Sequence, residues 1–205
     1  MSRHDLPAPA SAGLPAQLLR RFQDAARRRD APGGVVHVEE IPARPPRFAA
    51  LDPPLPPALQ RQLQGAGIRE LYTHQVSALT AARAGRDVLV VTGTASGKSL
   101  AYQLPVLETL LQDPGGHALF LFPTKALEQD QLKSLHQLIP WGSGLRAEIL
   151  DGDTPSHMRA KLRAAPPHIL ISNPDLLHLS LLPHHAAWKG FWERLRFLVL
   201  DELHT

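Results

Sequence analysis

The stretch that decides the fold is residues 87–99, which read DVLVVTGTASGKS. Residues 87–91 form a short, β-branched apolar run of the kind found in buried parallel strands. A loop of small residues follows, and a pattern typical of a helix then runs to about Gln112. A strand that enters a helix through a glycine-rich loop is the local arrangement of a phosphate-binding loop.

Small side chains in this loop let the backbone wrap around an anion with its N–H groups turned inward. The residues predicted to do so are Thr92, Gly93, Thr94, Ala95, Ser96 and Gly97. Lys98 is predicted to reach the β- and γ-phosphates, and the Ser99 hydroxyl to bind Mg²⁺. The general motif opens with glycine, whereas this loop opens with Thr92. The alternative is therefore a plain glycine-rich turn between a strand and a helix.

A second motif lies about 100 residues downstream, where the apolar run 196–200 ends in Asp201 and Glu202. Parallel strands deliver their carboxyl ends to one edge of a sheet, so these carboxylates are expected beside the phosphate loop. Asp201 is predicted to hold the magnesium, and Glu202 to polarise the water that attacks the γ-phosphate. The two motifs together predict ATP and Mg²⁺ as cofactors, with Lys98 and Glu202 as catalytic residues. Taken alone, the acidic pair could simply cap a turn.

From residue 58 onward, strand patterns alternate with helix patterns, which predicts an α/β fold with a parallel sheet flanked by helices. The expected strands after the phosphate loop are 117–122, 147–150, 168–172 and 196–200. Residues 1–57 hold eleven of the 20 prolines and are expected to form an irregular extension. Within it we expect a helix at 16–29 and a strand at 35–38.

The composition excludes several kinds of functional and structural site. The 205 residues include no cysteine, which excludes disulfides, thiolate zinc sites and a cysteine nucleophile. The eleven histidines are scattered, so no metal site is predicted from them. No apolar run reaches the roughly 18 residues of a membrane helix, and no membrane partner is expected. The absence of cysteine and of a secretory signal favours a cytoplasmic location. The net charge of +3 permits a nucleic-acid partner.

The tetrad Asp201-Glu202-Leu203-His204, combined with the phosphate loop, resembles the DEAD/DEAH-box helicases of superfamily two. Four further segments resemble the glutamine element and the strand-contact motifs of that family in the right order: LYTHQ (71–75), FPTKAL (122–127), DGDT (151–154) and SNPD (172–175). The residues of the phosphate loop (91–99) and of the LYTHQ segment are similar to those of the bacterial YprA-like group, which includes the mitomycin repair factor MrfA. In that group Thr92 is the expected residue.

The resemblance implies an ATP-dependent DNA helicase or translocase of DNA repair. It covers residues 58–205, which would be a first RecA-like P-loop domain that is incomplete at its C-terminal side. A second RecA-like domain, which supplies arginine fingers, would be required for full activity. The resemblance also implies that Gln75 reads the adenine and that His204 couples hydrolysis to strand binding.

A translocase must hold a single strand through its backbone, and hydroxyls, amides and a lysine at loop ends suit this task. The predicted contacts to single-stranded nucleic acid, DNA by resemblance, are Pro123, Thr124, Lys125, Gly152, Thr154, Asn173 and Pro174. Each element could instead serve only as a helix cap or a turn. Three other functions stay open: an RNA helicase, a fragment that binds nucleotide or nucleic acid without turnover, and, more remotely, a small-molecule kinase.

Overall fold

The computed structural model describes residues 14–26, 39, 45–92 and 96–202. The chain divides into two units, Met1–Pro45 and Pro46–Thr205. The first unit contains helix α1 (Leu14–Ala26), which covers most of the helix expected there. The strand expected at residues 35–38 lies outside the described residues.

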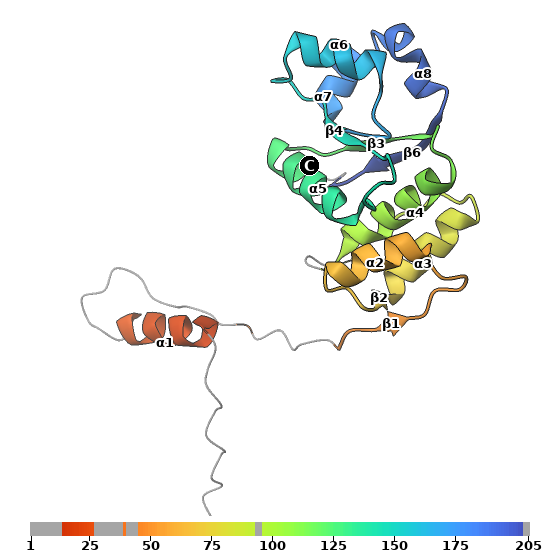
Figure 1. Cartoon of the computed structure of the whole chain (residues 1–205). Coiled ribbons are helices and arrows are strands. Elements are labelled where there is room, and N and C mark those ends of the chain that lie inside the picture. Colours follow the sequence, from red (N-terminus) through yellow and green to blue (C-terminus); the bar gives the residue numbers. More distant parts are fainter. Residues whose placement is uncertain (1–13, 27–38, 40–44, 93–95, 203–205) are drawn as a thin grey trace, which may run out of the picture. The chain divides into compact units, whose positions relative to one another are not determined.

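The second unit is built on a four-stranded parallel sheet with the strand order β4-β5-β3-β6 (Figure 1). The strands are β3 (His117–Leu121), β4 (Ala147–Ile149), β5 (Ile169–Ser172) and β6 (Leu195–Leu200). In the register of the sheet, Phe120 of β3 lies opposite Ile171 on one side and Val199 on the other. The predicted α/β fold with a parallel sheet is confirmed, and each of these four strands lies within about two residues of its expected range.

Helices cover both faces of the sheet, giving three layers (Figure 1). The helices on the first face are α4 (Lys98–Gln112) and α5 (Lys125–Leu138), and α2 (Pro57–Gly65) and α3 (Thr73–Arg83) pack against them on the side away from the sheet. The second face carries α6 (Ser156–Ala164), α7 (Pro174–Leu176), a π-helical turn η1 (Leu177–Leu181), a 3-10 turn η2 (His185–Trp188) and α8 (Lys189–Trp192). A short antiparallel pair, β1 (Phe48–Ala49) and β2 (Leu71–Tyr72), lies outside the main sheet.

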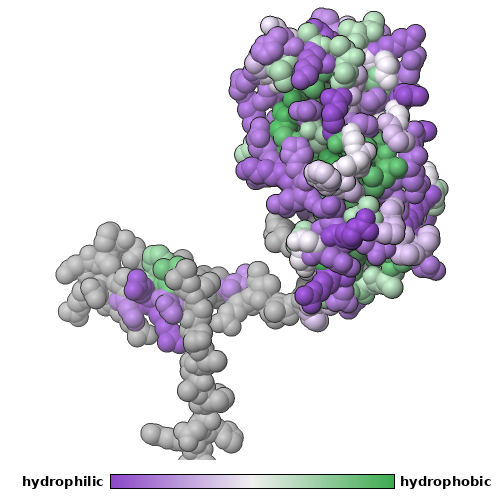
Figure 2. Space-filling view, viewed as in Figure 1, coloured by the Kyte–Doolittle hydropathy of each residue, from purple (hydrophilic) through white to green (hydrophobic). Residues whose placement is uncertain are grey.

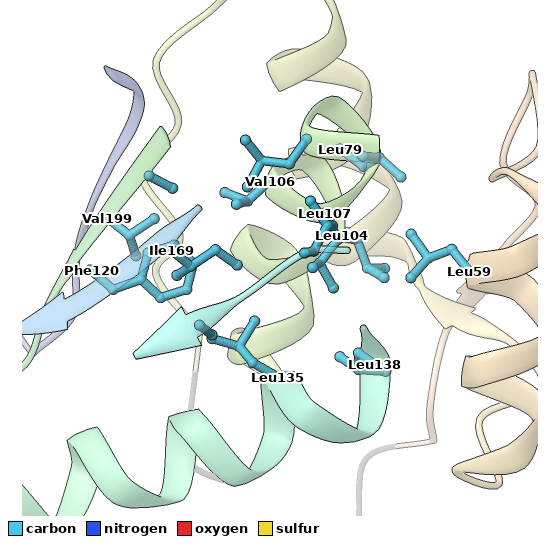
Figure 3. Packing of buried hydrophobic residues seen from close by; sticks show 14 of the residues in the cluster. Leu59, Leu79, Leu104, Val106, Leu107, Phe120, Leu135, Leu138, Ile169 and Val199 are labelled. Carbon is cyan, nitrogen blue, oxygen red and sulfur yellow. The ribbon is translucent and has the colours of Figure 1, made fainter. Parts of the chain in front are cut away.

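The larger core lies between the first face of the sheet and helices α2 to α5. Leu104 and Leu107 of α4 occupy its centre, between Leu59 of α2 and the strand residues Phe120 and Ile169 (Figure 3). All five side chains are fully buried. Burial on this scale stabilises the fold by about 1.5–3 kcal/mol per large apolar side chain, so α4 is fixed firmly against the sheet.

A smaller core covers the second face, where Leu119 and Leu170 pack beneath Leu181, Trp188 and Phe191. The rings of Trp188 and Phe191 meet edge to face at 6.1 Å. The sequence favours core packing over base stacking for Trp188 and Trp192. Trp188 is buried in this cluster, and Trp192 packs against it.

The prediction of a strand at residues 87–91 is wrong. These residues form no strand and pair with none of the described strands. Leu89 and Val91 are 79% and 84% exposed. A strand requires a hydrogen-bonding neighbour as well as an apolar sequence. On the sheet itself, β6 is an outer strand, and Leu198 and Leu200 along it are also exposed. Apolar surface appears between the helical layers, at the level of the sheet (Figure 2).

The boundary of the second unit also differs from the expected one at residue 57. The pairing of Phe48–Ala49 with Leu71–Tyr72 and the burial of Leu55 place residues 46–57 in the second unit. Proline restricts backbone hydrogen bonding, yet it tolerates extended segments at the margin of a fold. Within the described ranges, no helix has the length and apolar character that a bilayer crossing requires.

Candidate functional site

The phosphate loop meets the start of α4. Of its residues, Gly93, Thr94 and Ala95 lie outside the described structure, as does His204 at the other motif. The hydroxyls of Thr92 and Ser96 are 2.7 Å apart and share a hydrogen bond. Gly97 precedes the helix with a φ of +72°, and a Cβ there would lie 2.7 Å from Gln75 Nε2. This position therefore requires glycine for its backbone conformation and for its space.

Gln75 is buried beneath the loop. Its Oε1 accepts a hydrogen bond from the Tyr72 N–H at 2.9 Å, and its Nε2 donates to the Gly97 carbonyl at 2.9 Å. The side chain thus ties the phosphate loop to the start of α3. Its predicted role in reading an adenine stays a prediction.

The carboxyl end of β6 lies beside the start of α4, as the two motifs predict. Lys98 Nζ is 3.9 Å from Glu202 Oε1, with both side chains about one-third exposed. Asp201 is joined to the sheet because its N–H donates to the Leu121 carbonyl at 3.2 Å. Glu202 has a φ of +53°, a conformation that residues other than glycine rarely adopt and that often marks a functional site.

Ser99 and Asp201 are the residues predicted to hold the magnesium, and each has a side-chain partner. The Tyr102 hydroxyl donates to Asp201 Oδ2 at 3.1 Å, and the Gln131 amide donates to Ser99 Oγ at 3.1 Å. Burial raises the pKa of Tyr102, so it stays a neutral donor at physiological pH. A hydroxyl and a carboxylate are oxygen ligands of the kind that Mg²⁺ prefers, so these residues fit the ion.

A polar network extends from this site, and the sequence gives little sign of it. Gln131 Nε2 donates to Ser99 Oγ at 3.1 Å, and Gln103 Nε2 donates to Gln131 Oε1 at 2.8 Å. The signal that could have revealed it is Gln103, a polar residue at a buried position of α4, one residue before Leu104.

The three loops with predicted strand contacts lie along the same carboxyl edge of the sheet, after β3, β4 and β5. Thr124 is the N-cap of α5, and its Oγ1 accepts from the Leu127 N–H at 3.4 Å. Lys125 forms an ion pair with Asp153 of the next loop. The partnership raises the pKa of Lys125 and lowers the pKa of the Asp153 carboxyl.

The loop of residues 151–154 is closed by its own side chains. Asp151 Oδ1 accepts from the Asp153 N–H at 3.1 Å and from the Thr154 hydroxyl at 2.8 Å. Arg159 donates to the carbonyls of Thr154, Asp151 and Gly152 at 2.8–2.9 Å. The Thr154 N–H bonds to the Asp151 carbonyl at 3.3 Å, so this amide serves the turn rather than being presented to a phosphate.

Asn173 joins two helices. Its Oδ1 caps α7 by accepting from the Leu176 N–H at 2.9 Å, and its Nδ2 donates to Glu128 Oε1 at 3.0 Å. Pro174 is the first residue of α7, as expected. Glu128 is fully buried, its Oε2 has no hydrogen-bond partner among the described residues, and burial raises its pKa. The predicted contact between Asn173 and a phosphate stays a prediction.

Comparison with known proteins follows the same motifs. The family model described as DEAD/DEAH box helicase matches residues 72–205. The chain is 44% identical over 172 residues to the ATP-dependent helicase YprA of Bacillus subtilis, covering 83% of this chain and 23% of YprA. It is 37% identical over 173 residues to the ATP-dependent helicase HRQ1 of Saccharomyces cerevisiae, covering 83% of this chain and 16% of HRQ1.

Solved structures agree with these relatives. The DUF1998 helicase MrfA bound to DNA superimposes with a TM-score of 0.74 at 43% identity, over 78% of this chain and 22% of MrfA. MrfA bound to DNA and AMPPNP gives 0.73 at 42% identity, over 78% of this chain and 23% of that one. The chain thus spans about a quarter or less of the length of these proteins. With 134 of its 205 residues (72–205) matched to the family model, the chain belongs to the DEAD/DEAH box helicase family.

Proposed function

We propose that this chain is the N-terminal, ATP-binding portion of a DNA helicase or translocase used in DNA repair. The observation that carries the proposal is the meeting of two sets of residues at one sheet edge. Lys98 lies 3.9 Å from Glu202, while the loop of Lys125 follows the neighbouring strand β3. The similar helicase MrfA has been solved with both DNA and AMPPNP, which supports a combined nucleotide and DNA site.

In the proposed mechanism, Lys98 binds the β- and γ-phosphates of ATP through its ammonium group. Ser99 and Asp201 would hold Mg²⁺, and the bound ion would supply positive charge that neutralises the transferred phosphate. Glu202 accepts a hydrogen bond from the attacking water and orients it toward the γ-phosphate. Arginine fingers are worth several orders of magnitude in such reactions, so fast turnover requires a second RecA-like domain to supply them.

The strand would lie across the loops that follow β3, β4 and β5. Thr124, Lys125 and Asn173 would contact its phosphates, and the loop at Gly152 would approach the backbone closely. Contacts of this kind carry no base sequence and suit a motor that must pass any sequence. Binding should therefore depend strongly on salt and weakly on sequence.

The test is binding of a fluorescent single-stranded DNA to the 205-residue chain in the presence of AMPPNP and Mg²⁺, with unlabelled DNA and RNA of the same sequence as competitors. Lys125→Ala should weaken binding and reduce the slope of log affinity against log salt by about one. Lys133→Ala, an exposed lysine on the same helix, is the control.

Equal binding by Lys125→Ala and Lys133→Ala would contradict the proposed strand site. More effective competition by RNA would favour an RNA helicase. Binding of DNA with no nucleotide binding would leave only a nucleic-acid module.

A further inference from the structure

Polar side chains join α4 to α5 in a continuous series of hydrogen bonds. Gln131 Nε2 donates to Ser99 Oγ at 3.1 Å, and Gln103 Nε2 donates to Gln131 Oε1 at 2.8 Å. The series ends where the Ser134 hydroxyl donates to Gln103 Oε1 at 3.2 Å. Each bond has a defined direction, because amide nitrogens donate and amide oxygens accept.

The direction of these bonds determines which atom of the Gln131 amide faces Ser99. Gln103 donates to Gln131 Oε1, so the nitrogen of Gln131 must face the Ser99 hydroxyl. Gln103 is fully buried beside the leucines of the larger core, where an amide is costly unless it is hydrogen-bonded. The buried amide of Gln103 therefore holds the half-buried amide of Gln131 in one orientation.

At Ser99 the series meets the phosphate site. The Ser99 oxygen accepts from Gln131, and the Tyr102 hydroxyl, further along α4, donates to Asp201 Oδ2 at 3.1 Å. Each of the two residues predicted to hold the magnesium thus accepts a hydrogen bond from a neighbouring side chain. The bond to Cβ and the hydrogen bond from Gln131 occupy two of the four positions around the Ser99 oxygen, so Gln131 limits the directions left for its proton and its second lone pair.

The same helix reaches the strand loops. Helix α5 begins at Lys125, directly after its N-cap Thr124, and carries Gln131 less than two turns later. A helix moves as a rigid body over such a distance. A shift of α5 on strand binding would therefore move the amide of Gln131 relative to Ser99.

We propose that Gln131 is a positioning residue that orients the Ser99 hydroxyl toward the nucleotide-bound metal and thereby couples nucleotide binding to single-strand binding through α5. This inference rests on the proposed function of the two sites. Coupling of this kind is reciprocal, so each ligand changes the affinity for the other by the same factor.

The test uses the full chain and compares Gln131→Met with Gln129→Met. Gln129 is an exposed glutamine on the same helix and provides a matched control. Affinity for ATP is measured with Mg²⁺ and with EDTA, and affinity for single-stranded DNA with and without AMPPNP and Mg²⁺. We expect Gln131→Met to lose about tenfold in the Mg²⁺-dependent affinity, as for one lost hydrogen bond at a charged site. The affinity in EDTA should be unchanged, and the effect of nucleotide on DNA affinity should shrink toward onefold.

A second variant, Gln131→Glu, is included in case Gln131→Met does not fold. Circular dichroism checks the fold of each variant. In this second variant the carboxylate can still accept from Gln103 but, when ionised, cannot donate to Ser99. It should show the same loss of coupling. Equal affinity losses with Mg²⁺ and with EDTA would show a merely structural role and overturn the inference, as would wild-type coupling in either Gln131 variant. If the wild-type chain binds neither ATP nor DNA, the proposed function fails instead.

Discussion

Two runs of five residues, 87–91 and 117–121, each contain one polar and four apolar residues, but only the second forms a strand, β3. β3 pairs in parallel with β5 on one side and β6 on the other, and Phe120 at its centre is fully buried. Residues 87–91 pair with none of the strands in the described part of the chain, and Leu89 is 79% exposed. The comparison teaches that neighbours, rather than apolar character, decide which run becomes a strand.

The loops that follow the two runs differ in the same way. On the side of β3, β4 and β5, the turns are closed by Asp151, Arg159 and Asn173 through side-chain bonds to backbone groups. On the side of residues 87–91, Thr92 shares a hydrogen bond with Ser96, Gln75 donates to the Gly97 carbonyl, and Lys98 lies 3.9 Å from Glu202. The strand-contact loops are preformed by side chains close to them in the chain, whereas the described residues of the phosphate loop are held partly by Gln75, a side chain from another element.

The largest expected difference between the runs is in stability. Phe120→Ala should lower the free energy of unfolding by about 3–5 kcal/mol, because it leaves a cavity in the larger core. Leu89→Ala should change it by less than about 0.5 kcal/mol, because this side chain lies on the surface. Urea unfolding followed by circular dichroism measures both. Similar losses in the two variants would show that residues 87–91 are packed as a strand after all.

A second difference concerns the preformed loops. Arg159→Ala removes the hydrogen bonds to the carbonyls of Asp151, Gly152 and Thr154 and should cost about 1–2 kcal/mol. It should also speed hydrogen exchange in the loop of residues 151–154. Arg163→Ala, an exposed arginine on the same helix, is the control. Equal hydrogen exchange of residues 151–154 in both variants would show that this loop does not depend on the hydrogen bonds of Arg159.

A third expectation concerns pH. Burial raises the pKa of Glu128 above its ordinary value of 4.5, so the folded state holds the proton more tightly than the unfolded state. The stability that this group contributes is therefore lost as the pH rises from 4.5 through the raised folded pKa. Glu128→Gln can keep the bond from Asn173 and has no charge to bury.

The stability of Glu128→Gln relative to wild type should thus increase as the pH rises from about 4.5 toward neutrality. Asp151 and Lys125 influence the same carboxyl with opposite signs, and both remain in the variant. Urea unfolding of the two proteins at a series of pH values gives the difference. A difference that does not vary with pH would mean that Glu128 titrates normally.

The smallest expected effect is at the strand loops. Asp153→Asn removes the carboxylate that pairs with Lys125 and should tighten binding of single-stranded DNA by about two- to fivefold at low salt. Asp130→Asn makes the same change of charge at the exposed pair with Lys133 on α5. Salt-dependent fluorescence anisotropy should separate the two. Identical affinities would show that only net charge matters.

Much of this structure could be predicted from the sequence. Alternating apolar patterns predicted the parallel sheet and its flanking helices. The approach of Lys98 to Glu202 was also expected from the rule that parallel strands end at one edge, although residues 87–91 do not form the strand to which the rule was applied. These features depend on local patterns and on a general rule of topology. For the same reason, the caps at Thr124 and Asn173 were foreseen as alternatives to binding roles.

The rest depends on which side chains become neighbours in space. The pairing of Gln103 with Gln131, the Arg159 clamp and the link from Tyr102 to Asp201 join residues from different elements or turns. A glutamine on a helix pattern reads as an ordinary polar position, whatever it contacts. The wrong prediction of a strand at residues 87–91 has the same cause. A strand needs a hydrogen-bonding neighbour, and the sequence of these residues does not show which segment lies beside them.

The central claim is that the end of this sheet binds ATP through Lys98, and equilibrium titration with ATP and Mg²⁺ tests it most directly. The wild-type chain, Lys98→Ala and the control Lys133→Ala would be compared by calorimetry. We expect wild type and Lys133→Ala to bind alike, and Lys98→Ala to lose at least about tenfold in affinity because a charge-assisted phosphate contact is removed. Equal binding by all three proteins, or no binding by the folded wild-type chain, would contradict the claim.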